Sequence, residues 1–275
     1  MKKTEHFAKG SRVGAVLLAR SDSSRLPGKS LLDLCGRPVL AHQMDRLKCA
    51  SKPVEFVLAT TTRSLDDGLC RVAESCGFKA FRGSVHDVVL RLRDAASARG
   101  IDLLVVAGGD DVFCDPAFMD RLVDEYVKQP YDFITIEGVP FGTSPFGVTR
   151  SALDRLIDIR ADDNTDGWER YFTDTGLFSC RSLHCDDPAL AHPEIRLDLD
   201  YPEDLELIRE IYKRLYKTGA VPPLKRVLRL LLEEEPELAR INRAAHEKWL
   251  KNRAAAWPPI RLKPGVSANT QGDRR

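Results

Sequence analysis

The chain has 275 residues, of which 42 are Lys or Arg and 41 are Asp or Glu, so its net charge is +1. A chain of this length can bury a large core as one α/β domain, alone or with a small appendage. The balanced charge creates no overall field that would attract nucleic acid or a membrane surface, so we expect neither as a partner and any anion specificity must be local.

Apolar runs alternate with amphipathic stretches through the first half of the chain. The apolar runs predict strands at 13–19, 54–60, 79–83, 102–109 and 131–138. The amphipathic stretches predict helices that begin at Pro38 and at about residues 64, 86 and 115. This alternation predicts an α/β fold, with an open and mostly parallel sheet that carries helices on both faces.

The segment 139–180 is less regular, because Pro140, Gly142, Pro145 and Gly147 interrupt it before a helix predicted at 151–160. We expect it to form an acceptor-binding lobe or lid, or a dimerisation insertion. Its aromatic residues suit either a core or a lid, and the sequence leaves both open; they are Trp168, Tyr171 and Phe172.

The last third of the chain returns to regular patterns. "EIRLDLD" (194–200) predicts a strand, residues 202–219 a helix, and 222–250 two helices broken at Pro236. An apolar stripe on these two helices could pack on the sheet or on a second subunit, and with the low net charge it favours a homodimer. The stripe consists of Leu224, Val227, Leu228, Leu231, Leu238, Ile241 and Ala245.

These patterns divide the chain into three parts. A main domain is expected at 11–219, C-terminal helices at 220–256, and a disordered tail rich in Pro, Gly and polar residues at 257–275. The polar start of the chain and the short apolar run after it fit neither a signal peptide nor a membrane span. Seven cysteines without C-x-x-C spacing indicate buried thiols in a reducing compartment, so we expect a cytoplasmic protein.

The stretch "ARSDSSRLPGKSL" (19–31) follows the first predicted strand and carries three cations. Its Gly-Lys-Ser ending is similar to that of a P-loop, but that motif requires glycine where this chain has Ser23, and Pro27 removes a further N–H group. A different anion-binding loop is therefore predicted. Asp110 follows the 102–109 strand, so it lies at the same edge of the sheet, where open α/β sheets bind ligands.

The same stretch resembles the A-R-x-x-S-x-R-L-P-G-K-x-L signature of the cytidylyltransferases that activate acidic sugars. This group includes the 3-deoxy-manno-octulosonate enzyme, and the resemblance is strongest to its spore-coat polysaccharide branch. Shorter matches follow in order at 59–67, 81–91, 108–116, 198–209 and 236–242. Ser144 departs from the family pattern, which has an acid there, so the acceptor is not identified by the resemblance.

The resemblance implies a glycosyltransferase-A-like fold, with 11–219 as the nucleotidyltransferase domain, that binds CTP and Mg²⁺. Arg20, Arg25 and Lys29 would hold the triphosphate, and Asp110 and Asp200 would bind the metal. Arg20, Lys29, Asp110 and Asp200 would carry the catalysis. The remaining implied nucleotide contacts are Ala19, Ser23, Ala59, Thr60, Thr61, Gly83, Asp87 and Arg91.

The implied reaction transfers CMP from CTP to an acidic sugar or similar small acceptor, with release of pyrophosphate, for cell-surface polysaccharide biosynthesis. Two other functions stay open: a glycosyltransferase that uses a nucleotide sugar, and a noncatalytic partner in polysaccharide assembly. Structural roles also compete with the site roles. Asp110 could be a turn residue, Asp200 a helix-start residue, and Asp87 a charge at a helix N-terminus.

Overall fold

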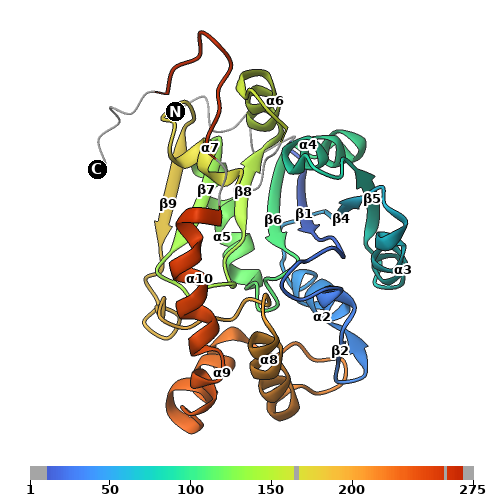
Figure 1. Cartoon of the computed structure of the whole chain (residues 1–275), viewed down its shortest axis with the longest axis vertical. Coiled ribbons are helices and arrows are strands. Elements are labelled where there is room, and N and C mark those ends of the chain that lie inside the picture. Colours follow the sequence, from blue (N-terminus) through green and yellow to red (C-terminus); the bar gives the residue numbers. More distant parts are fainter. Residues whose placement is uncertain (1–10, 164–166, 257–258, 269–275) are drawn as a thin grey trace.

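The computed structural model describes residues 11–163, 167–256 and 259–268. Its centre is a seven-stranded sheet in the order β5-β4-β1-β6-β8-β7-β9 (Figure 1). The strands are β1 (Val13–Leu18), β4 (Glu55–Thr61), β5 (Lys79–Gly83), β6 (Leu103–Gly108), β7 (Phe133–Glu137), β8 (Phe146–Thr149) and β9 (Cys180–His184). The strands predicted in the first half of the chain are therefore present.

One strand of this sheet runs against its neighbours. Strands β5, β4, β1 and β6 are parallel, and Val16 of β1 pairs with Val57 on one side and Val106 on the other. Strand β8 is antiparallel to both β6 and β7, whereas β9 is parallel to β7. The prediction of a mostly parallel sheet is confirmed. Because β8 comes from the segment 139–180, part of this segment belongs to the central sheet, and its role in acceptor binding or dimerisation stays a prediction.

Helices cover both faces of the sheet (Figure 1). On β1, Ala15 and Leu17 belong to a core formed with α2, α5 and α8, whereas Val16 belongs to a second core formed with α4 and α6. The alternation follows from the two-residue period of a strand, and both faces are apolar because both are covered. The helices are α2 (Val39–Leu47), α3 (Asp67–Ser75), α4 (Val88–Arg99), α5 (Pro116–Lys128), α6 (Arg150–Ile159), α7 (Glu169–Thr173), α8 (Pro202–Leu215), α9 (Leu224–Arg229) and α10 (Arg243–Ala256).

The aromatic residues of the middle segment lie in the second core. Trp168, Tyr171 and Phe172 are all buried, and the Phe172 ring stacks on that of Phe133 in β7, with 4.9 Å between the centroids. Of the two alternatives that the sequence left open, the structure therefore shows the core and not the lid.

The segment 194–200 is extended but is not a strand of the sheet, so this prediction was wrong. It makes a single bridge, between Arg196 and Phe141. Its backbone hydrogen bonds go to two different loops: Leu197 N donates to Phe141 O at 2.8 Å, and Leu199 N donates to Asp110 O at 3.0 Å. No continuous ladder forms, because the partners belong to separate connections after β7 and β6.

The apolar stripe of the C-terminal helices packs inside the chain. Leu224, Val227, Leu228, Leu231 and Leu238 are buried in the first core, together with residues of α2, α5 and α8. This removes the observation that favoured a second subunit, and the homodimer stays a prediction.

Part of the expected disordered tail has defined contacts. Residues 259–268 are described, Leu262 bridges to Arg160, and Lys263 N donates to Ile159 O at 2.8 Å. The rest of that expectation concerns 257–258 and 269–275, which lie outside the described residues.

The cysteines differ from the expectation of buried thiols. All seven are free, but only Cys114 is buried, and Cys35, Cys49 and Cys180 are exposed. Within the described residues, no helix combines the length and apolar character needed to cross a membrane.

Candidate active site

The basic loop after β1 folds back on itself and carries Lys29 into the interior. Gly28 has φ 67°, a left-handed conformation that glycine adopts without strain, and its N–H donates to Ser21 O at 3.1 Å. Lys29 then begins a 3₁₀ turn, η1 (Lys29–Leu31). The Pro-Gly pair thus makes a tight turn, and Lys29 is only 8% exposed.

Lys29 joins two carboxylates from distant parts of the chain. Its Nζ lies 2.8 Å from Asp200 Oδ1 and 3.3 Å from Asp110 Oδ2. Asp110 follows β6 and Asp200 precedes α8, so the three residues meet at the carboxyl edge of the parallel strands. The sequence predicted that these residues would share one edge, and the structure brings them together.

The charges in this cluster determine the protonation of its members. Burial alone lowers the pKa of Lys29, but Asp110 and Asp200 outweigh burial and hold that pKa above its ordinary value. Burial alone would raise the pKa of Asp200, but Lys29 and Arg25 outweigh it and hold that pKa below its ordinary value. At neutral pH the ammonium and the carboxylate are therefore both charged.

Arg25 lies on the other side of Asp200. Its Nη2 is 2.5 Å from Asp200 Oδ2, and its guanidinium carbon is 5.5 Å from the centroid of the Tyr201 ring. Its side chain is 43% exposed, so the guanidinium is accessible to an anion from solvent. Two of the three predicted triphosphate contacts, Arg25 and Lys29, are thus within one cluster.

Arg20, the third, lies apart from them. Its Nε is 3.1 Å from Asp22 Oδ1. The pKa of the Arg91 guanidinium is lowered mainly by burial, and the positive charge of Arg20 lowers it further. Arg20 therefore belongs to the half of the site built on β4 and β5. Ser23 accepts a hydrogen bond from Leu26 N at 3.3 Å, which stabilises the turn.

The ends of β1, β4 and β5 form this second half of the site. Ala19 N donates to Ala59 O at 3.3 Å, and Thr61 pairs with Gly83 across β4 and β5. Thr60 and Thr61 are both buried. The predicted nucleotide contacts Ala19, Ala59, Thr60, Thr61 and Gly83 are thus brought together.

The side chains of Asp87 and Arg91 are engaged within the protein. Asp87 accepts from Leu90 N at 2.9 Å as the N-cap of α4, and from Arg160 Nη1 at 2.7 Å in a buried ion pair. Arg91 donates from Nε to Ser84 O at 2.8 Å, and from Nη2 to Val85 O at 3.1 Å. The helix-cap alternative for Asp87 is therefore confirmed, and a nucleotide contact by either side chain stays a prediction.

A family model described as a cytidylyltransferase matches residues 15–181, which include the basic loop, Lys29 and Asp110. The chain belongs to the cytidylyltransferase family. It is a CTP-dependent nucleotidyltransferase.

Three known proteins illustrate the relationship. This cytidylyltransferase is 28% identical over 234 residues to the spore coat polysaccharide biosynthesis protein SpsF of Bacillus subtilis, covering 82% of this chain and 95% of that one. It is 31% identical over 121 residues to the 3-deoxy-manno-octulosonate cytidylyltransferase of Trichlorobacter lovleyi, with coverages of 43% and 46%. The structure of a cytidylyltransferase from Leptospira borgpetersenii superposes with a TM-score of 0.76, at 25% identity, over 84% of this chain and 97% of that one.

Sequence reasoning about the cytidylyltransferase missed a buried carboxylate, Asp66, that connects the two halves of the site. Asp66 accepts from Ser21 N at 2.8 Å, from Thr61 N at 3.3 Å and from the Thr61 hydroxyl. It therefore fixes the start of the basic loop to the end of β4. The residue lies within the matched segment 59–67, but nothing in its spacing distinguished it from its half-buried neighbour Asp67.

It also missed Asp198 and the network behind it. Asp198 Oδ1 lies 2.8 Å from Arg196 Nη2. Burial raises the pKa of Asp198 well above its ordinary value; Arg196 opposes this rise, and the charges of Asp110 and Asp200 add to it. A third acidic group therefore lies beside the Asp110–Asp200 pair. The alternation of apolar and charged residues in 194–200 could have indicated this, because one face of that segment is entirely charged.

Asp204, in the first turn of α8, fixes the position of Asp200. It is fully buried, and its Oδ2 accepts from the backbone N–H groups of Asp200 at 3.0 Å and Tyr201 at 2.9 Å. Arg196 Nε and Asn242 Nδ2 donate to its Oδ1 at 3.1 and 2.8 Å. The turn that presents Asp200 is therefore held by a carboxylate four residues further on and by the C-terminal part of the chain.

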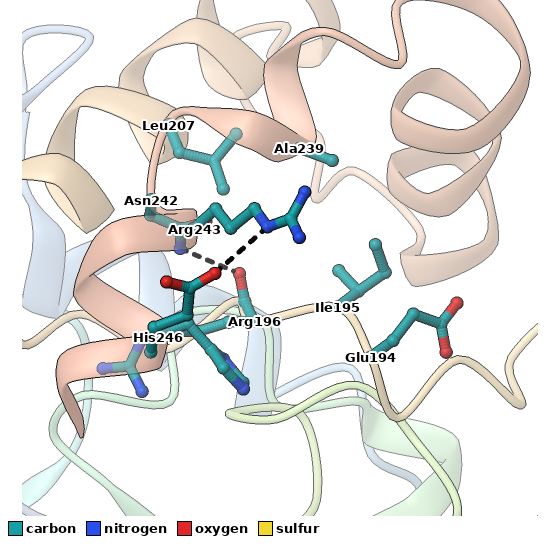
Figure 2. A pocket seen from close by; sticks show the side chains of 9 residues that line it. Glu194, Ile195, Arg196, Leu207, Ala239, Asn242, Arg243 and His246 are labelled. Atoms are coloured by element: carbon teal, nitrogen blue, oxygen red, sulfur yellow. Dashed lines mark hydrogen bonds and ion pairs between the residues drawn. The ribbon is translucent and has the colours of Figure 1, made fainter. Parts of the chain in front are cut away.

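Figure 2 shows a pocket of about 350 Å³ between α10 and the segment 194–196, lined among others by Ile195, Asn242, Arg243 and His246. None of the predicted site residues lines it. The Arg196 backbone carbonyl faces Asn242 there, whereas its guanidinium faces Asp198 and Asp204. The candidate site is therefore the acidic cluster and not this pocket.

The carboxylates suit a hard divalent cation only in part. Mg²⁺ typically takes one or two protein carboxylates and completes its shell with water and phosphate oxygens. Asp110 and Asp200 share one cation, the Lys29 ammonium, so their oxygens already converge. No three His, Cys, Asp or Glu side chains among the described residues form a ready-made metal site. This donor set fits a metal that is shared with a bound nucleotide.

Proposed function

We propose that the protein transfers CMP from CTP to an acidic sugar or a similar small acceptor, releasing pyrophosphate, in cell-surface polysaccharide biosynthesis. The observation that carries this proposal is the convergence of Lys29 and Arg25 with Asp110 and Asp200 at the carboxyl edge of the sheet. Support for the acceptor class comes from the similarity to a 3-deoxy-manno-octulosonate cytidylyltransferase, and for the pathway from the spore coat relative.

In this proposal, Lys29 and Arg25 bind the phosphates. Nucleotidyl transfer develops negative charge around phosphorus, so fixed cations that face it favour the transition state. Both side chains are held by Asp200, which places the two charges in fixed positions before CTP binds. On binding, phosphate oxygens would compete with Asp200 and Asp110 for these cations.

Asp110 and Asp200 would hold the Mg²⁺ that arrives with CTP. When bound, a divalent cation supplies charge neutralisation at the phosphates and lowers the pKa of a hydroxyl that it contacts. Asp204 and Arg196 keep Asp200 oriented for this role through buried hydrogen bonds. We propose Mg²⁺ for this role on the donor chemistry alone, since carboxylate oxygens are the ligands that it prefers.

The two halves of the site would bind different parts of the substrates. The ends of β4 and β5, with Thr60, Thr61 and Gly83, would bind cytosine and ribose, largely through backbone groups. The acceptor would approach from the other side of Asp110, where Phe141 and Tyr201 lie. The alternative of a noncatalytic partner is disfavoured by the buried Lys29, whose charge it would leave without a use. The alternative of a sugar-nucleotide glycosyltransferase is disfavoured by the match of the basic loop to the cytidylyltransferase family.

A direct test combines nucleotide binding with turnover. Calorimetric titrations in Mg²⁺ should give tighter binding of CTP than of ATP or GTP, because a purine would not fit a cleft shaped for a pyrimidine. Pyrophosphate release should then require both CTP and an acidic acceptor. Equal affinity for ATP would refute the cytidylyl assignment, and CTP binding without pyrophosphate release from any acidic sugar would favour the noncatalytic alternative.

A further inference from the structure

Three cationic side chains surround the ring of Tyr201, next to Asp200. The guanidinium carbons of Arg25 and Arg196 lie 5.5 and 5.7 Å from the ring centroid, and Lys248 Nζ lies 5.6 Å from it. Two of these charges are already paired, because Arg25 contacts Asp200 and Arg196 contacts Asp198 and Asp204. Lys248 differs, since it is exposed and no described carboxylate lies within 4 Å of its ammonium.

Helix α10 places Lys248 on one particular side of the acidic cluster. The next residue, Trp249, packs against Phe141, with 4.5 Å between the ring centroids. Phe141 follows β7 and is hydrogen-bonded to the segment 195–197, whereas the predicted cytosine contacts lie at the ends of β4 and β5. In Figure 1, α10 accordingly crosses the β7–β8 part of the sheet, away from β4 and β5. Lys248 therefore lies on the side of Asp200 opposite the base.

The first turn of α10 is fixed by buried contacts, and these contacts hold the helix that carries Lys248 against the rest of the protein. Asn242 Nδ2 donates to Arg196 O at 3.2 Å, a contact drawn in Figure 2, and to Asp204 at 2.8 Å. Ala245, one turn before Trp249, is also buried. The same two residues, Arg196 and Asp204, thus anchor both α10 and the turn that presents Asp200.

The negative charges of the site explain how this lysine would help an acidic acceptor to bind. An acidic acceptor must bring a carboxylate close to Asp200 and to the triphosphate, both of which repel it. A cation that is not neutralised by the protein, on the acceptor side, offsets that repulsion and selects an acid over a neutral sugar. Arg25 and Arg196 are less suited, because Asp200, Asp198 and Asp204 already neutralise them.

We propose that Lys248 is a specificity-determining residue of the acceptor site, and that its ammonium binds the carboxylate of the acceptor beside Tyr201. This inference rests on the proposed function. It assigns part of the acceptor site to the C-terminal helix, outside the segment 15–181 that the family model covers.

The test uses the full chain with CTP and Mg²⁺, and follows pyrophosphate release with 3-deoxy-manno-octulosonate, N-acetylneuraminate and the methyl ester of each. Lys248→Met should raise the acceptor KM by about 10-fold while the KM for CTP stays unchanged, as expected for loss of one charge-assisted hydrogen bond. The preference of the enzyme for acid over ester should fall by a similar factor. Lys248→Arg should retain most of this preference, because it keeps the charge.

Lys251 supplies the matched control, because it is an exposed lysine three residues further along α10 without a recorded ion pair among the described residues. Lys251→Met should leave both KM values unchanged. Acceptor KM and acid preference at the wild-type level in Lys248→Met would overturn the inference and leave the proposed function intact. Failure of the wild-type enzyme to release pyrophosphate with any acid would instead overturn the proposed function, and the inference with it.

Discussion

Lys29 and Asp200 are 171 residues apart in the chain, and their side chains meet at 2.8 Å. The contact joins the loop after β1 to the turn before α8, and Asp110 shares the same ammonium at 3.3 Å. The Lys29 ammonium and the Asp200 carboxylate, which are both charged at neutral pH, lie beside Asp110. This cluster can separate phosphate binding from metal binding, and substitutions distinguish the two roles.

Removing one carboxylate charge should impair metal use. Asp200→Asn and Asp110→Asn keep the side-chain size but delete a charge that would face the metal, so activity should fall by about 10²-fold or more. Higher Mg²⁺ should recover part of the loss if metal affinity is the defect. Rates across a magnesium series, with thermal melts to confirm folding, measure this.

Glu203→Gln is the control for these variants, because Glu203 is an exposed carboxylate in the same turn as Asp200. It should retain wild-type rates. Wild-type turnover in Asp200→Asn would mean that Asp200 is only a helix-start residue, and the two-carboxylate metal site would have to be abandoned.

Lys29→Met should behave differently from the aspartate variants. It removes a proposed phosphate contact, so the Kd for CTP should rise by roughly 10- to 100-fold, in the range for a charge-assisted hydrogen bond in a partly dry site. Added Mg²⁺ should restore little of this affinity. Titration calorimetry checks the prediction, with the exposed Lys213→Met as control, and an unchanged Kd for CTP would remove Lys29 from the phosphate site.

Asp66→Asn tests whether the basic loop must be fixed to β4. The substitution keeps one oxygen acceptor but breaks at least one of the contacts to Ser21 and Thr61, at a cost of about 1–3 kcal/mol of stability. CTP should bind several-fold more weakly, because the loop that carries Arg20, Arg25 and Lys29 becomes less well ordered. Chemical denaturation and calorimetry measure both effects. The neighbouring Asp67→Asn, at a half-buried position where Asp67 pairs with Arg82 and not with the basic loop, should leave the Kd for CTP unchanged, and a similar loss there would count against the idea.

Asp87 has two possible roles that a pair of variants separates. If its main role is the buried pair with Arg160, then Asp87→Asn and Arg160→Met should both lower stability by about 3–5 kcal/mol, since each leaves a charge or polar group without its partner. A nucleotide contact predicts instead that Asp87→Asn weakens CTP binding and Arg160→Met does not. Denaturation curves and CTP titrations on both variants decide between them.

His42 should make the stability of the protein depend on pH. Burial lowers the pKa of His42 below its ordinary 6.5, although its Nε2 lies 2.7 Å from Leu34 O. The unfolded chain therefore binds a proton at higher pH than the folded one, so the free energy of unfolding falls as the pH drops below about 6.5. The slope due to this residue is at most about 1.4 kcal/mol per pH unit.

His42→Gln isolates this effect. The variant should be less stable than the wild type at pH 7.5, because the edge contacts of the ring with Tyr212 and Tyr216 are lost, and the difference should shrink toward pH 5.5. Urea denaturation at several pH values measures it, with the exposed His184→Gln as control. A difference that stays constant with pH would show that His42 does not titrate in this way.

The sequence predicted the strands of the first half of the chain, including the short β5, and missed β8 and β9. Strands β1, β4 and β6 are buried on both faces, so their sequences show no polar interruption. Strand β8 is "FGVT", preceded by Pro145 and containing Gly147, which are loop signals when read locally. Its place between β6 and β7 depends on contacts far away in the chain, which no local pattern reports.

The segment 194–200 shows how a correct pattern can support a wrong element. Ile195, Leu197 and Leu199 are buried in the first core, whereas Arg196, Asp198 and Asp200 are buried on the opposite side in the acidic cluster. The two-residue alternation is real, but its polar face turns toward the active site and not toward solvent. Periodicity reports which residues share a face, and it does not report what that face contacts.

For the candidate site, residue type and position after strands were enough to place the basic loop and Asp110 at one edge of the sheet. The resemblance to the family added Asp200, which follows a segment that is not a strand. The positioning residues were not predictable in the same way. Asp66 and Asp204 act by accepting backbone N–H groups, and any Asp in a turn or a first helical turn has the same local signature. Only the fold shows which of these carboxylates are buried against the site.

The antiparallel insertion of β8 also determines when the chain can complete its sheet during synthesis. Strand β6, "LLVVAG", pairs with β1 on one side and with β8 on the other. Until residues 146–149 have left the ribosome, the nascent chain presents β6 as an uncovered apolar edge, the kind of surface that joins chains to one another. We therefore expect a fragment that ends between residues 108 and 146 to expose this edge and to aggregate more readily than the full chain.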